Sequence, residues 1–220
     1  MRESNFKSPF FSVIICTFNR AALLNRALDS LLHQPESDWE AIIIDDGSTD
    51  NTKEILNKYL EQNQNIKYFF QENHGSGYSK NEGLKQSSGR YISFLDSDDE
   101  YLHEHLTSRK KILLENSTID LLYGGAKIIG NPYVPDFENP GKQIHLDNCI
   151  IGGTLFIKRE MALKIGGFSA LRFGEDYEFF QRAIKHNFKI MKTEEPTYVY
   201  HRDGDDSLCD SKKKINFFLD

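Results

Sequence analysis

The sequence predicts an α/β protein built on a mostly parallel sheet, and three observations carry that prediction. Apolar runs of strand length recur along the first half of the chain. The segments between them repeat apolar residues at helical spacing, and polar residues follow directly where several of the runs end. Strands that alternate with helices form a parallel sheet covered by helices on both faces, so we expect that architecture for residues 10–95.

The first strand and helix show the pattern most clearly. Residues 10–17 form a nearly continuous apolar run rich in β-branched side chains, which is typical of a strand buried on both faces. Leucine and alanine then recur at helical spacing over residues 23–32, after a predicted cap at Asn19. Pro35 ends this helix. A strand followed by a helix is therefore the repeating unit.

The alternation continues through most of the first half. We expect further strands at residues 39–44, 66–70 and 91–95, and helices at residues 50–60, 79–86 and 104–114. Beyond residue 120 the pattern changes. Residues 121–129 and 150–158 have the composition of longer strands, and two loops rich in Asn, Pro and Gly separate them. We expect this second part to be a smaller mixed sheet with loops, packed beside the first.

Composition places the chain among soluble globular proteins. Its 220 residues, 39% of them hydrophobic, are enough to bury the core of a single domain. The formal net charge of −6 argues against nucleic acid as a partner, because binding to a phosphate backbone requires clustered Lys and Arg. The three cysteines lie far apart and form no CxxC pair. This spacing favours a reducing compartment, and hence a cytoplasmic location, over a disulfide framework or a zinc site.

For the two ends of the chain we expect neither a membrane span nor a signal peptide. No apolar stretch reaches the roughly 18 residues of a spanning helix, and residues 1–5 are too polar to begin a signal peptide. Near the other end, lysines at 212–214 precede several apolar residues. This tail is open to two interpretations: a basic, apolar segment that rests on an anionic membrane surface, or a frayed last helix.

An acidic cluster follows the strand predicted at residues 91–95. Asp96, Asp98 and Asp99 come directly after it. Carboxylates this close together repel each other unless a cation is present, and oxygen ligands suit a divalent metal. The alternative is a solvated acidic turn. The cluster is therefore a candidate metal site.

Polar residues also follow two other predicted strands. Residues 17–20, Thr-Phe-Asn-Arg, come after the first strand, and residues 45–48, Asp-Asp-Gly-Ser, come after the second. Ligands of open α/β sheets collect at the carboxyl ends of the strands. We therefore expect these two segments and the acidic cluster to line one cleft.

Together these segments resemble the family 2 glycosyltransferases, which have the GT-A fold. The similarity covers residues 11 to 207 and rests on five motifs in the family's order and spacing: Ser12 to Arg20, Ile43 to Asp50, Asn81-Glu82-Gly83, the acidic cluster and Gly174-Glu175-Asp176. The resemblance implies a single GT-A domain over residues 1–220, with a Rossmann-like, mostly parallel sheet flanked by helices. It also implies a nucleotide-binding half at about 11–100, an acceptor-binding half with a smaller mixed sheet at about 101–207, and a C-terminal tail at 208–220.

The resemblance assigns nucleotide-binding roles to residues of the first half. Asp46 sits where relatives hold the base edge of the donor, and a carboxylate can accept a hydrogen bond from a ring N–H. Thr17, Asn19 and Arg20 resemble residues that line the nucleotide pocket. Lys80 stands where many relatives carry Arg, so the charge is kept but the bidentate fork is lost. The alternative for the strand ends is local structure: turns and helix caps.

The resemblance also assigns the metal site and the base. Asp98 matches the aspartate that coordinates Mn²⁺ or Mg²⁺, Asp96 lies near the ribose or the metal, and His201 reaches the diphosphate or the metal. Asp176 resembles the catalytic base, although acidic residues are common at helix starts because of the helix dipole. A lone histidine is often structural, and Asp99 either adds an outer contact or caps a helix that begins near residue 101.

The implied activity is that of an inverting glycosyltransferase, which moves a sugar from a nucleotide diphosphosugar to an acceptor hydroxyl. UDP is the commonest nucleotide among relatives, while GDP and dTDP stay open. A saccharide or lipid-linked acceptor, and surface polysaccharide synthesis at the inner face of a bacterial membrane, follow by analogy. Two other classes stay open. One is a catalytically inactive GT-A-like binding protein. The other is a sugar nucleotidyltransferase, which should carry a Gly-rich loop that residues 19–22 lack.

Overall fold

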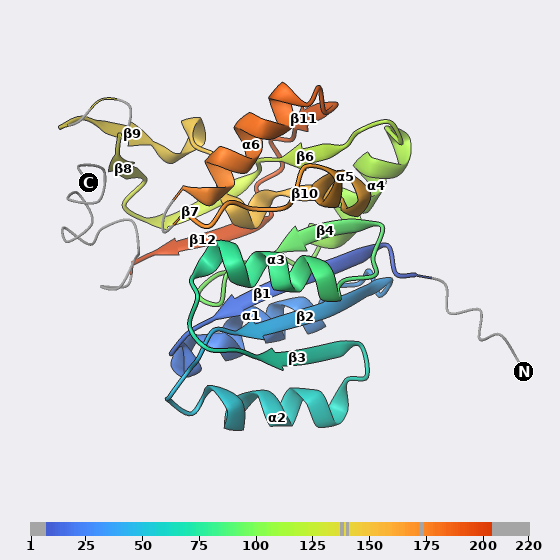
Figure 1. Ribbon diagram of the computed structural model, residues 1–220, viewed down its shortest axis with the longest axis vertical. Coiled ribbons are helices and arrows are strands. Elements are labelled where there is room, and N and C mark those ends of the chain that lie inside the picture. The colour runs from blue at the N-terminus through green and yellow to red at the C-terminus, as the bar shows by residue number, and fades with distance from the viewer. Residues whose placement is uncertain (1–7, 137–138, 140, 172–173, 204–220) are drawn as a thin grey trace, which may run out of the picture.

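A seven-stranded sheet forms the centre of the computed structural model, which describes residues 8–136, 139, 141–171 and 174–203 (Figure 1). The strand order is β11-β6-β10-β4-β1-β2-β3, and only β10 runs antiparallel to its neighbours. The strands are β1 (Phe11–Thr17), β2 (Trp39–Asp45), β3 (Ile66–Phe70), β4 (Tyr91–Phe94), β6 (Leu121–Tyr123), β10 (Phe156–Lys158) and β11 (Ile190–Lys192). The predicted α/β fold with a mostly parallel sheet is confirmed.

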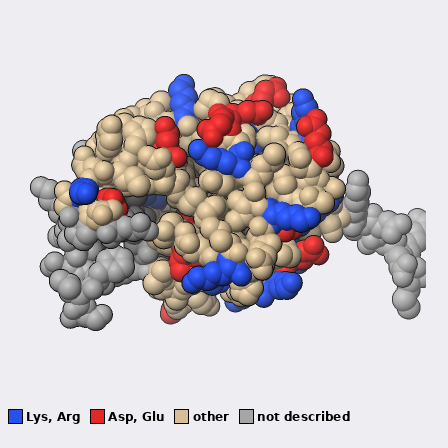
Figure 2. Space-filling view, turned by 90° about the horizontal axis from the view of Figure 1, so that it is seen from above, with Lys and Arg blue, Asp and Glu red and all other residues tan. Residues whose placement is uncertain are grey.

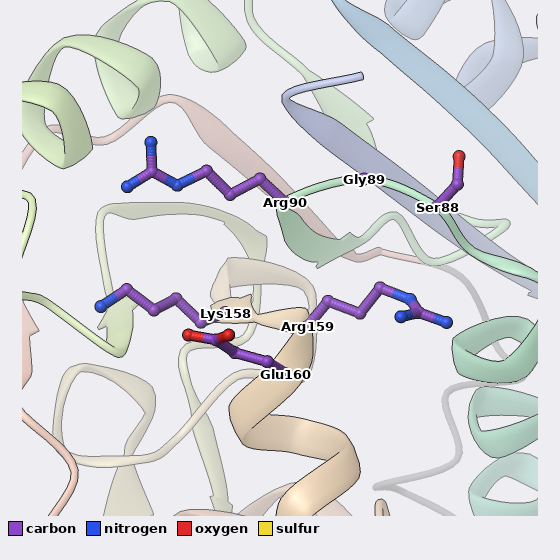
Figure 3. A pocket seen from close by; sticks show the side chains of 6 residues that line it. All are labelled: Ser88, Gly89, Arg90, Lys158, Arg159 and Glu160. Carbon is purple, nitrogen blue, oxygen red and sulfur yellow. The ribbon is translucent and has the colours of Figure 1, made fainter. Parts of the chain in front are cut away.

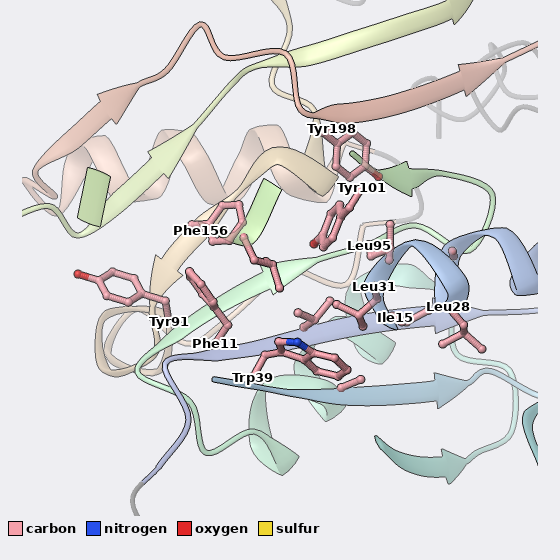
Figure 4. Close-up of a cluster of buried hydrophobic side chains, with 14 of the residues drawn as sticks. Phe11, Ile15, Leu28, Leu31, Trp39, Tyr91, Leu95, Tyr101, Phe156 and Tyr198 are labelled. Carbon is pink, nitrogen blue, oxygen red and sulfur yellow. The ribbon is translucent and has the colours of Figure 1, made fainter. Parts of the chain in front are cut away.

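Helices cover both faces of this sheet. Alternate residues of β1 point to opposite faces, so Val13 and Ile15 join one hydrophobic cluster and Ile14 joins another. The first cluster (Figure 4) packs against α1 (Ala21–Leu32), α2 (Thr52–Gln62) and α4 (His105–Glu115). The second packs against α3 (Ser76–Gln86), α5 (Arg159–Lys164) and α6 (Glu175–Lys185). The core is thus two apolar layers separated by the sheet.

Two small sheets and two short 3₁₀ turns belong to the later part of the chain. One sheet has the order β5-β12-β7, from β5 (Glu100–Tyr101), β12 (Tyr198–Arg202) and β7 (Ala126–Gly130). The other pairs β8 (Tyr133–Pro135) with β9 (Gln143–His145). The turns are η1 (Leu146–Asn148) and η2 (Gly152–Thr154). The expected smaller mixed sheet is present, because β12 pairs antiparallel with β5 and parallel with β7, but β6, β10 and β11 of the same part extend the central sheet instead of lying beside it.

The two long strands predicted for this part are wrong. Gly124 and Gly125, with φ of 92° and 74°, break the segment 121–129 into β6 and β7, which belong to different sheets. A Cβ added at Gly125 would overlap the backbone oxygen of Glu195, so only glycine allows this turn. In the segment 150–158 only the last residues form a strand, because η2 precedes β10.

Two predicted caps are also wrong. Asn19 does not cap α1: Arg20 precedes the helix, while Asn19 adopts φ 52° and its Oδ1 accepts a hydrogen bond from Thr49 N at 2.8 Å. Asp99 caps no helix, since α4 begins only at His105 and the Asp99 side chain is fully buried. Both side chains instead tie neighbouring segments of the site together.

The surface and the termini add little to the placement of the site. On the face shown in Figure 2, acidic and basic side chains are interspersed, and neither sign gathers into a patch. Within the part of the chain that the structure describes, no helix combines the length and hydropathy needed to cross a bilayer. The tail at 208–220, with its lysines at 212–214, lies outside the described residues.

Candidate functional site

The carboxyl ends of β4, β1 and β2 lie side by side in the sheet, as the sequence predicts for one polar edge. Asp46 N donates to Thr17 O at 2.9 Å, and Leu95 N donates to Ile14 O at 3.1 Å. These bonds continue the strand pairing past the regular strands. The segments that begin at Thr17, Asp45 and Asp96 therefore leave the sheet next to each other.

Asp46 is buried, and its carboxylate holds the loop that leads to α3. Its oxygens accept hydrogen bonds from Gln71 Nε2 at 2.7 Å, from His74 N at 2.9 Å and from Gly75 N at 2.8 Å. An ionised carboxylate offers about four lone-pair sites, so capacity for a ligand remains. The predicted contact of Asp46 with a nucleotide base stays a prediction.

The loops after β1 and β2 are bound to each other by side chains. Asn19 N donates to Ser48 Oγ at 2.9 Å, which adds to the Thr49 bond described above. Thr17 Oγ1 is buried and has no hydrogen-bond partner among the described residues. Arg20 lies between β1 and α1. The predicted nucleotide residues are thus neighbours, and Thr17 has a polar group available for a ligand.

A buried ion cluster joins α3 to the start of α6. Lys80 Nζ lies 2.9 Å from Glu175 Oε1 and 2.5 Å from Asp176 Oδ1, and Ser76 Oγ donates to Glu175 Oε1 at 2.6 Å. Burial lowers the pKa of Lys80, but the charges of Asp176 and Glu175 outweigh it and raise the pKa above its usual value. Lys80 is therefore a cation held against the predicted base, and its predicted phosphate contact remains a prediction.

Asp176, the predicted base, occupies the first turn of α6. Burial raises its pKa, Lys80 opposes this effect, and Glu175 adds to it. The η2 turn closes over the carboxylate: a Cβ added at Gly152 would overlap Asp176 Oδ2. A carboxyl with a raised pKa is a stronger base than an exposed one once it is ionised.

The acidic cluster is not a solvated turn. Asp99 is fully buried, and its carboxylate accepts hydrogen bonds from Tyr198 Oη at 2.6 Å and from His201 N at 2.8 Å. Burial and the charges of Asp96 and Asp98 raise the pKa of Asp99 to about 9. For Asp96, burial is again the main cause: Lys80 opposes it, nearby carboxylates add to it, and the pKa rises to about 7.

The structure does not assemble the predicted metal ligands Asp96, Asp98 and His201 into one cluster. The His201 ring is engaged elsewhere, with Nε2 3.1 Å from Glu100 Oε1 and Nδ1 3.4 Å from Asp203 Oδ1. Among the described residues, no group of three or more His, Cys, Asp or Glu side chains is arranged to hold a metal ion. A metal at this edge would therefore need ligands from a bound molecule as well.

The donor chemistry nevertheless fits a divalent cation. Lys80 contacts the carboxylates of Glu175 and Asp176 and interacts electrostatically with Asp96, and Asp98 in turn interacts with Asp96. Burial first, and then the charges of the neighbouring carboxylates, raise the pKa of Asp96. Mg²⁺ is commonly held by one or two carboxylates together with substrate phosphates, rather than by a complete protein cage. The site thus has the oxygen ligands and the excess of negative charge that such an ion requires.

The Asn81-Glu82-Gly83 motif supports the site without facing it. Asn81 Nδ2 donates to Phe168 O at 2.7 Å, and Phe168 N donates to Asn81 Oδ1 at 2.7 Å, so the side chain fixes the loop that leads to α6. A Cβ added at Gly83 would overlap the Ile14 side chain, so glycine lets α3 approach β1 closely. This motif therefore sets the position of α3 and, through residue 80, of the ion cluster.

A hollow at the opposite end of the sheet is not a second candidate site. It is lined by Ser88, Gly89, Arg90, Lys158, Arg159 and Glu160, beside the amino end of β4 (Figure 3). The Arg90 and Lys158 side chains point one way and Arg159 points the other. Lys158 Nζ lies 2.9 Å from Asp120 Oδ1, and Arg159 Nε donates to Ser87 Oγ at 3.0 Å. The cations do not converge on a common ligand position.

Comparison with known proteins identifies the family. Residues 12–180 match the family model described as Glycosyl transferase family 2. The chain belongs to this family. The predicted resemblance is confirmed, and the described motifs of the polar edge all fall within or beside the matched residues.

Among curated relatives of this family, similarity extends over different shares of the chain. A Campylobacter jejuni GalNAc(5)-diNAcBac-PP-undecaprenol beta-1,3-glucosyltransferase is 42% identical over 137 residues, which is 61% of this chain and 42% of that protein. A Bacillus subtilis protein, TuaG, whose name provisionally assigns it to teichuronic acid biosynthesis, is 36% identical over 169 residues, 74% of this chain and 67% of its own. The chain therefore spans less than half the length of the first of these relatives.

Solved structures of other glycosyltransferases share the fold. TarS 1-349 from S. aureus, in complex with UDP-GlcNAc, superposes with a TM-score of 0.75 at 27% identity, covering 89% of this chain and 59% of that one. The mannosyltransferase PcManGT from Pyrobaculum calidifontis, in complex with GDP-Man and Mn²⁺, gives 0.71 at 18% identity, covering 89% and 57%. The GT-A assignment thus holds for most of the chain.

Sequence reasoning missed several residues that shape the site. Glu175 was treated only as part of a motif, yet it shares Lys80 with Asp176. Tyr198 was likewise not singled out, although its hydroxyl binds Asp99. Gly152 carries no motif at all, and only its contact with Asp176 shows its importance. For Glu175 the sequence carries a signal: two adjacent acidic residues at a predicted helix start need a cation nearby if they are buried.

Proposed function

We propose that this chain transfers a sugar from a nucleotide diphosphosugar to an acceptor hydroxyl with inversion at the anomeric carbon. The observation that carries the proposal is the buried cluster of Lys80, Glu175 and Asp176 next to the acidic turn at Asp96. It combines a candidate base with carboxylates suited to a cation on one edge of the sheet. Membership of family 2 supports the same activity.

The donor is proposed to be a UDP-sugar, bound by the loops after β1 and β2. Thr17, Asn19 and Arg20 line the nucleotide pocket, and Asp46 accepts a hydrogen bond from the base. Two observations support this placement: Thr17 Oγ1 is buried with no partner among the described residues, and Asp46 retains acceptor capacity. The UDP-GlcNAc complex of the related TarS supports UDP as the nucleotide.

Asp98 and Asp96 are proposed to hold Mn²⁺ or Mg²⁺ together with the diphosphate oxygens. Such an ion would neutralise the charge that develops on the departing nucleoside diphosphate. Lys80 contributes a fixed positive charge that interacts with Asp96. The His201 ring, which lies 3.1 Å from Glu100 Oε1, would supply a further ligand for the metal or the diphosphate.

Asp176 is proposed to act as the base. Its carboxylate takes the proton of the acceptor hydroxyl while that oxygen forms a bond to the anomeric carbon, and the bond from this carbon to the diphosphate breaks on the opposite face. Lys80 keeps Asp176 ionised in a buried position, where its proton affinity is raised. A single displacement of this kind inverts the anomeric configuration.

The proposed setting is surface polysaccharide or glycolipid synthesis at the cytoplasmic face of a bacterial membrane. Residues 11–100 would bind the nucleotide, and residues 101–207 would bind a saccharide or lipid-linked acceptor. The name of the Campylobacter relative, which includes PP-undecaprenol, supports a lipid-linked acceptor. The two small sheets, which are formed only by strands that follow residue 99, support a separate acceptor region beside the central sheet.

The substitution Asp176→Asn tests the assignment of the base. The amide is similar in size but cannot take up the proton. We therefore expect the rate of hydrolysis of a UDP-sugar, measured as released UDP with water in place of the acceptor, to fall by about 10²-fold or more, as for a lost general base. Calorimetric affinity for UDP with Mn²⁺ should change less than threefold. Asp147→Asn, at an exposed aspartate of η1, is the matched control. Normal turnover in the Asp176 variant would place the base elsewhere.

A further inference from the structure

Three polar side chains follow one another at intervals of four residues along α1 and the turn after it. They are Arg26, Ser30 and Gln34. Residues four apart lie on the same side of a helix, so the three form one stripe. The neighbouring stripe carries the buried apolar residues Leu24, Ala27, Leu28 and Leu31, which pack on the sheet. The polar stripe therefore lies beside the apolar contact.

All three side chains bind the backbone that leads away from the acidic cluster. Arg26 Nη2 donates to the backbone oxygen of Asp98. Ser30 Oγ accepts from Tyr101 N at 3.0 Å. Gln34 donates from Nε2 to Leu102 O at 2.9 Å, and its Oε1 accepts from Leu106 N at 3.0 Å. One helix thus holds the main chain from residue 98 to residue 106.

The Arg26 contact is the one nearest the site, and it is a strong one. A hydrogen bond from a guanidinium to a carbonyl is charge-assisted and holds its geometry better than a neutral bond. Arg26 Nε is buried and has no hydrogen-bond partner among the described residues, so the guanidinium is held through the hydrogen bond of Nη2 to the Asp98 carbonyl. The position of Asp98 is thereby tied to α1.

Other bonds fix the same turn on its inner side. Asp99 N donates to Asp96 O at 3.0 Å, and Tyr101 Oη donates to Phe94 O at 2.8 Å. The acidic turn is consequently held between β4 and α1. Because α1 begins directly after the loop at residues 17–20, a rigid helix connects the proposed nucleotide pocket to the proposed metal ligand.

We propose that Arg26 is a positioning residue for Asp98, and that the polar stripe of α1 sets the distance between the nucleotide loop and the metal-binding carboxylates. The inference rests on the proposed function, which makes Asp98 a metal ligand. Arg26 itself touches neither substrate nor metal. It acts through the main chain of residue 98.

The test measures binding of Mn²⁺ to the full chain in the presence of saturating UDP, by calorimetry and by electron paramagnetic resonance of free Mn²⁺. Arg26→Ala should weaken Mn²⁺ binding by about 10-fold or more, the range known for residues that orient metal ligands. Binding of UDP without metal should stay within twofold of wild type. Arg159→Ala is the matched control, since it removes a half-buried guanidinium at the far end of the sheet and should leave both affinities unchanged.

Two further variants allow the inference to be tested even if Arg26→Ala does not fold. Arg26→Lys keeps the charge and most of the aliphatic stem and should show an intermediate Mn²⁺ affinity. Ser30→Ala removes the hydroxyl that accepts from Tyr101 N and donates to Ala27 O within α1, and it should weaken Mn²⁺ binding in the same direction. Unchanged Mn²⁺ affinity in folded Arg26→Ala and Ser30→Ala overturns the inference. If the wild-type chain with UDP binds no Mn²⁺, the proposed metal role of Asp98 fails first, and the two failures are thereby distinguished.

Discussion

At the scale of single residues, Lys80 has the largest electrostatic role in the described structure. Its side chain is 5% exposed and contacts Glu175 and Asp176, which are 9% and 21% exposed. A buried ammonium without partners would lose its proton, whereas here two carboxylates keep it charged. The cost of burying one cation and two anions is offset only while all three are present. The cluster is therefore sensitive to the loss of its single cation.

Lys80→Met should destabilise the protein by about 3–5 kcal/mol near neutral pH, because it leaves two adjacent buried carboxylates without a cation. For Glu175, burial raises the pKa, but Lys80 and Ser76 outweigh it and lower the pKa below its ordinary 4.5. The contribution of Glu175 is therefore present above that pH and is lost as pH falls through its lower folded value, whereas Asp176, whose pKa is raised, contributes in the opposite direction. In the variant both carboxyls can protonate, so the destabilisation should shrink on acidification.

Urea unfolding of both proteins between pH 4 and pH 8, about the range in which carboxyls and their raised neighbours titrate, measures this difference. Lys158→Met is the control, because Lys158 pairs with Asp120 at 2.9 Å with both side chains 15% exposed, away from the site. Its effect should be smaller and nearly independent of pH in this range. A Lys80 variant whose loss of stability is constant with pH would contradict the described ion cluster.

Single residues of the site were predictable where chemistry and strand ends coincide. Asp46 and Asp176 fall at the predicted edge because each follows a recognisable motif. The partner of Asp176 was not predictable, since Lys80 lies on a different helix and only the packing of α3 against the α6 loop brings them together. Likewise, the sequence cannot show that Asp99 is buried and bound by Tyr198 rather than exposed.

At the scale of elements, η2 is the short turn that determines how close the base can lie to the rest of the site. Gly152 contacts the Asp176 carboxylate, and Gly153 contacts the Tyr198 ring, so that a Cβ at either position would overlap its neighbour. Tyr198 in turn binds Asp99. The two glycines therefore fill the space between the base and the acidic turn with backbone alone.

Gly152→Ala should displace the Asp176 carboxylate and lower the rate of UDP release by about 10²-fold, the size of effect expected from a 1 Å misplacement of a reacting group. Affinity for UDP should be retained, because the proposed nucleotide residues Thr17, Asn19, Arg20 and Asp46 lie on the loops after β1 and β2 and not on η2. The control is Gly141→Ala, where φ of 87° strains an alanine but an added Cβ meets nothing within 4 Å, so that it shows the effect of backbone strain without a displaced carboxylate. Steady-state kinetics and UDP calorimetry on both variants separate the two effects. A Gly152 variant with wild-type turnover would show that Asp176 tolerates displacement.

Element boundaries were predicted well in the first half and poorly in the second. Strand and helix positions up to residue 115 follow from apolar periodicity, since each element is long enough to show its period. In the second half the strands β6 and β10 have only three residues each, too few for a period to be recognised. The turn at Gly124 and Gly125 then separates two apolar segments that sequence reasoning had joined.

At the scale of the whole molecule, the fold places an excess of carboxylates on one edge of a sheet whose interior is apolar. The sequence predicted this arrangement because parallel strands bring their carboxyl ends to the same edge. It could not predict that the carboxylates would remain unassembled as a metal site in the described structure. The physical reason is that strand ends fix which carboxylates share an edge, whereas the distances between their side chains depend on loop packing that no motif encodes.

Nucleotide and metal should therefore stabilise the folded chain cooperatively. Each ligand completes the site for the other, and reciprocity requires that Mn²⁺ raise the affinity for UDP by the same factor by which UDP raises the affinity for Mn²⁺. A ligand that binds only the folded state raises the melting temperature. We expect UDP with Mn²⁺ to raise it by more than the sum of the separate shifts, and GDP, dTDP and CMP with Mn²⁺ to raise it less.

Asp98→Asn should leave only the shift due to UDP alone, whereas Asp147→Asn should behave as wild type. Additive shifts would show that nucleotide and metal bind independently. A larger shift with GDP or dTDP than with UDP would make that nucleotide the proposed donor instead.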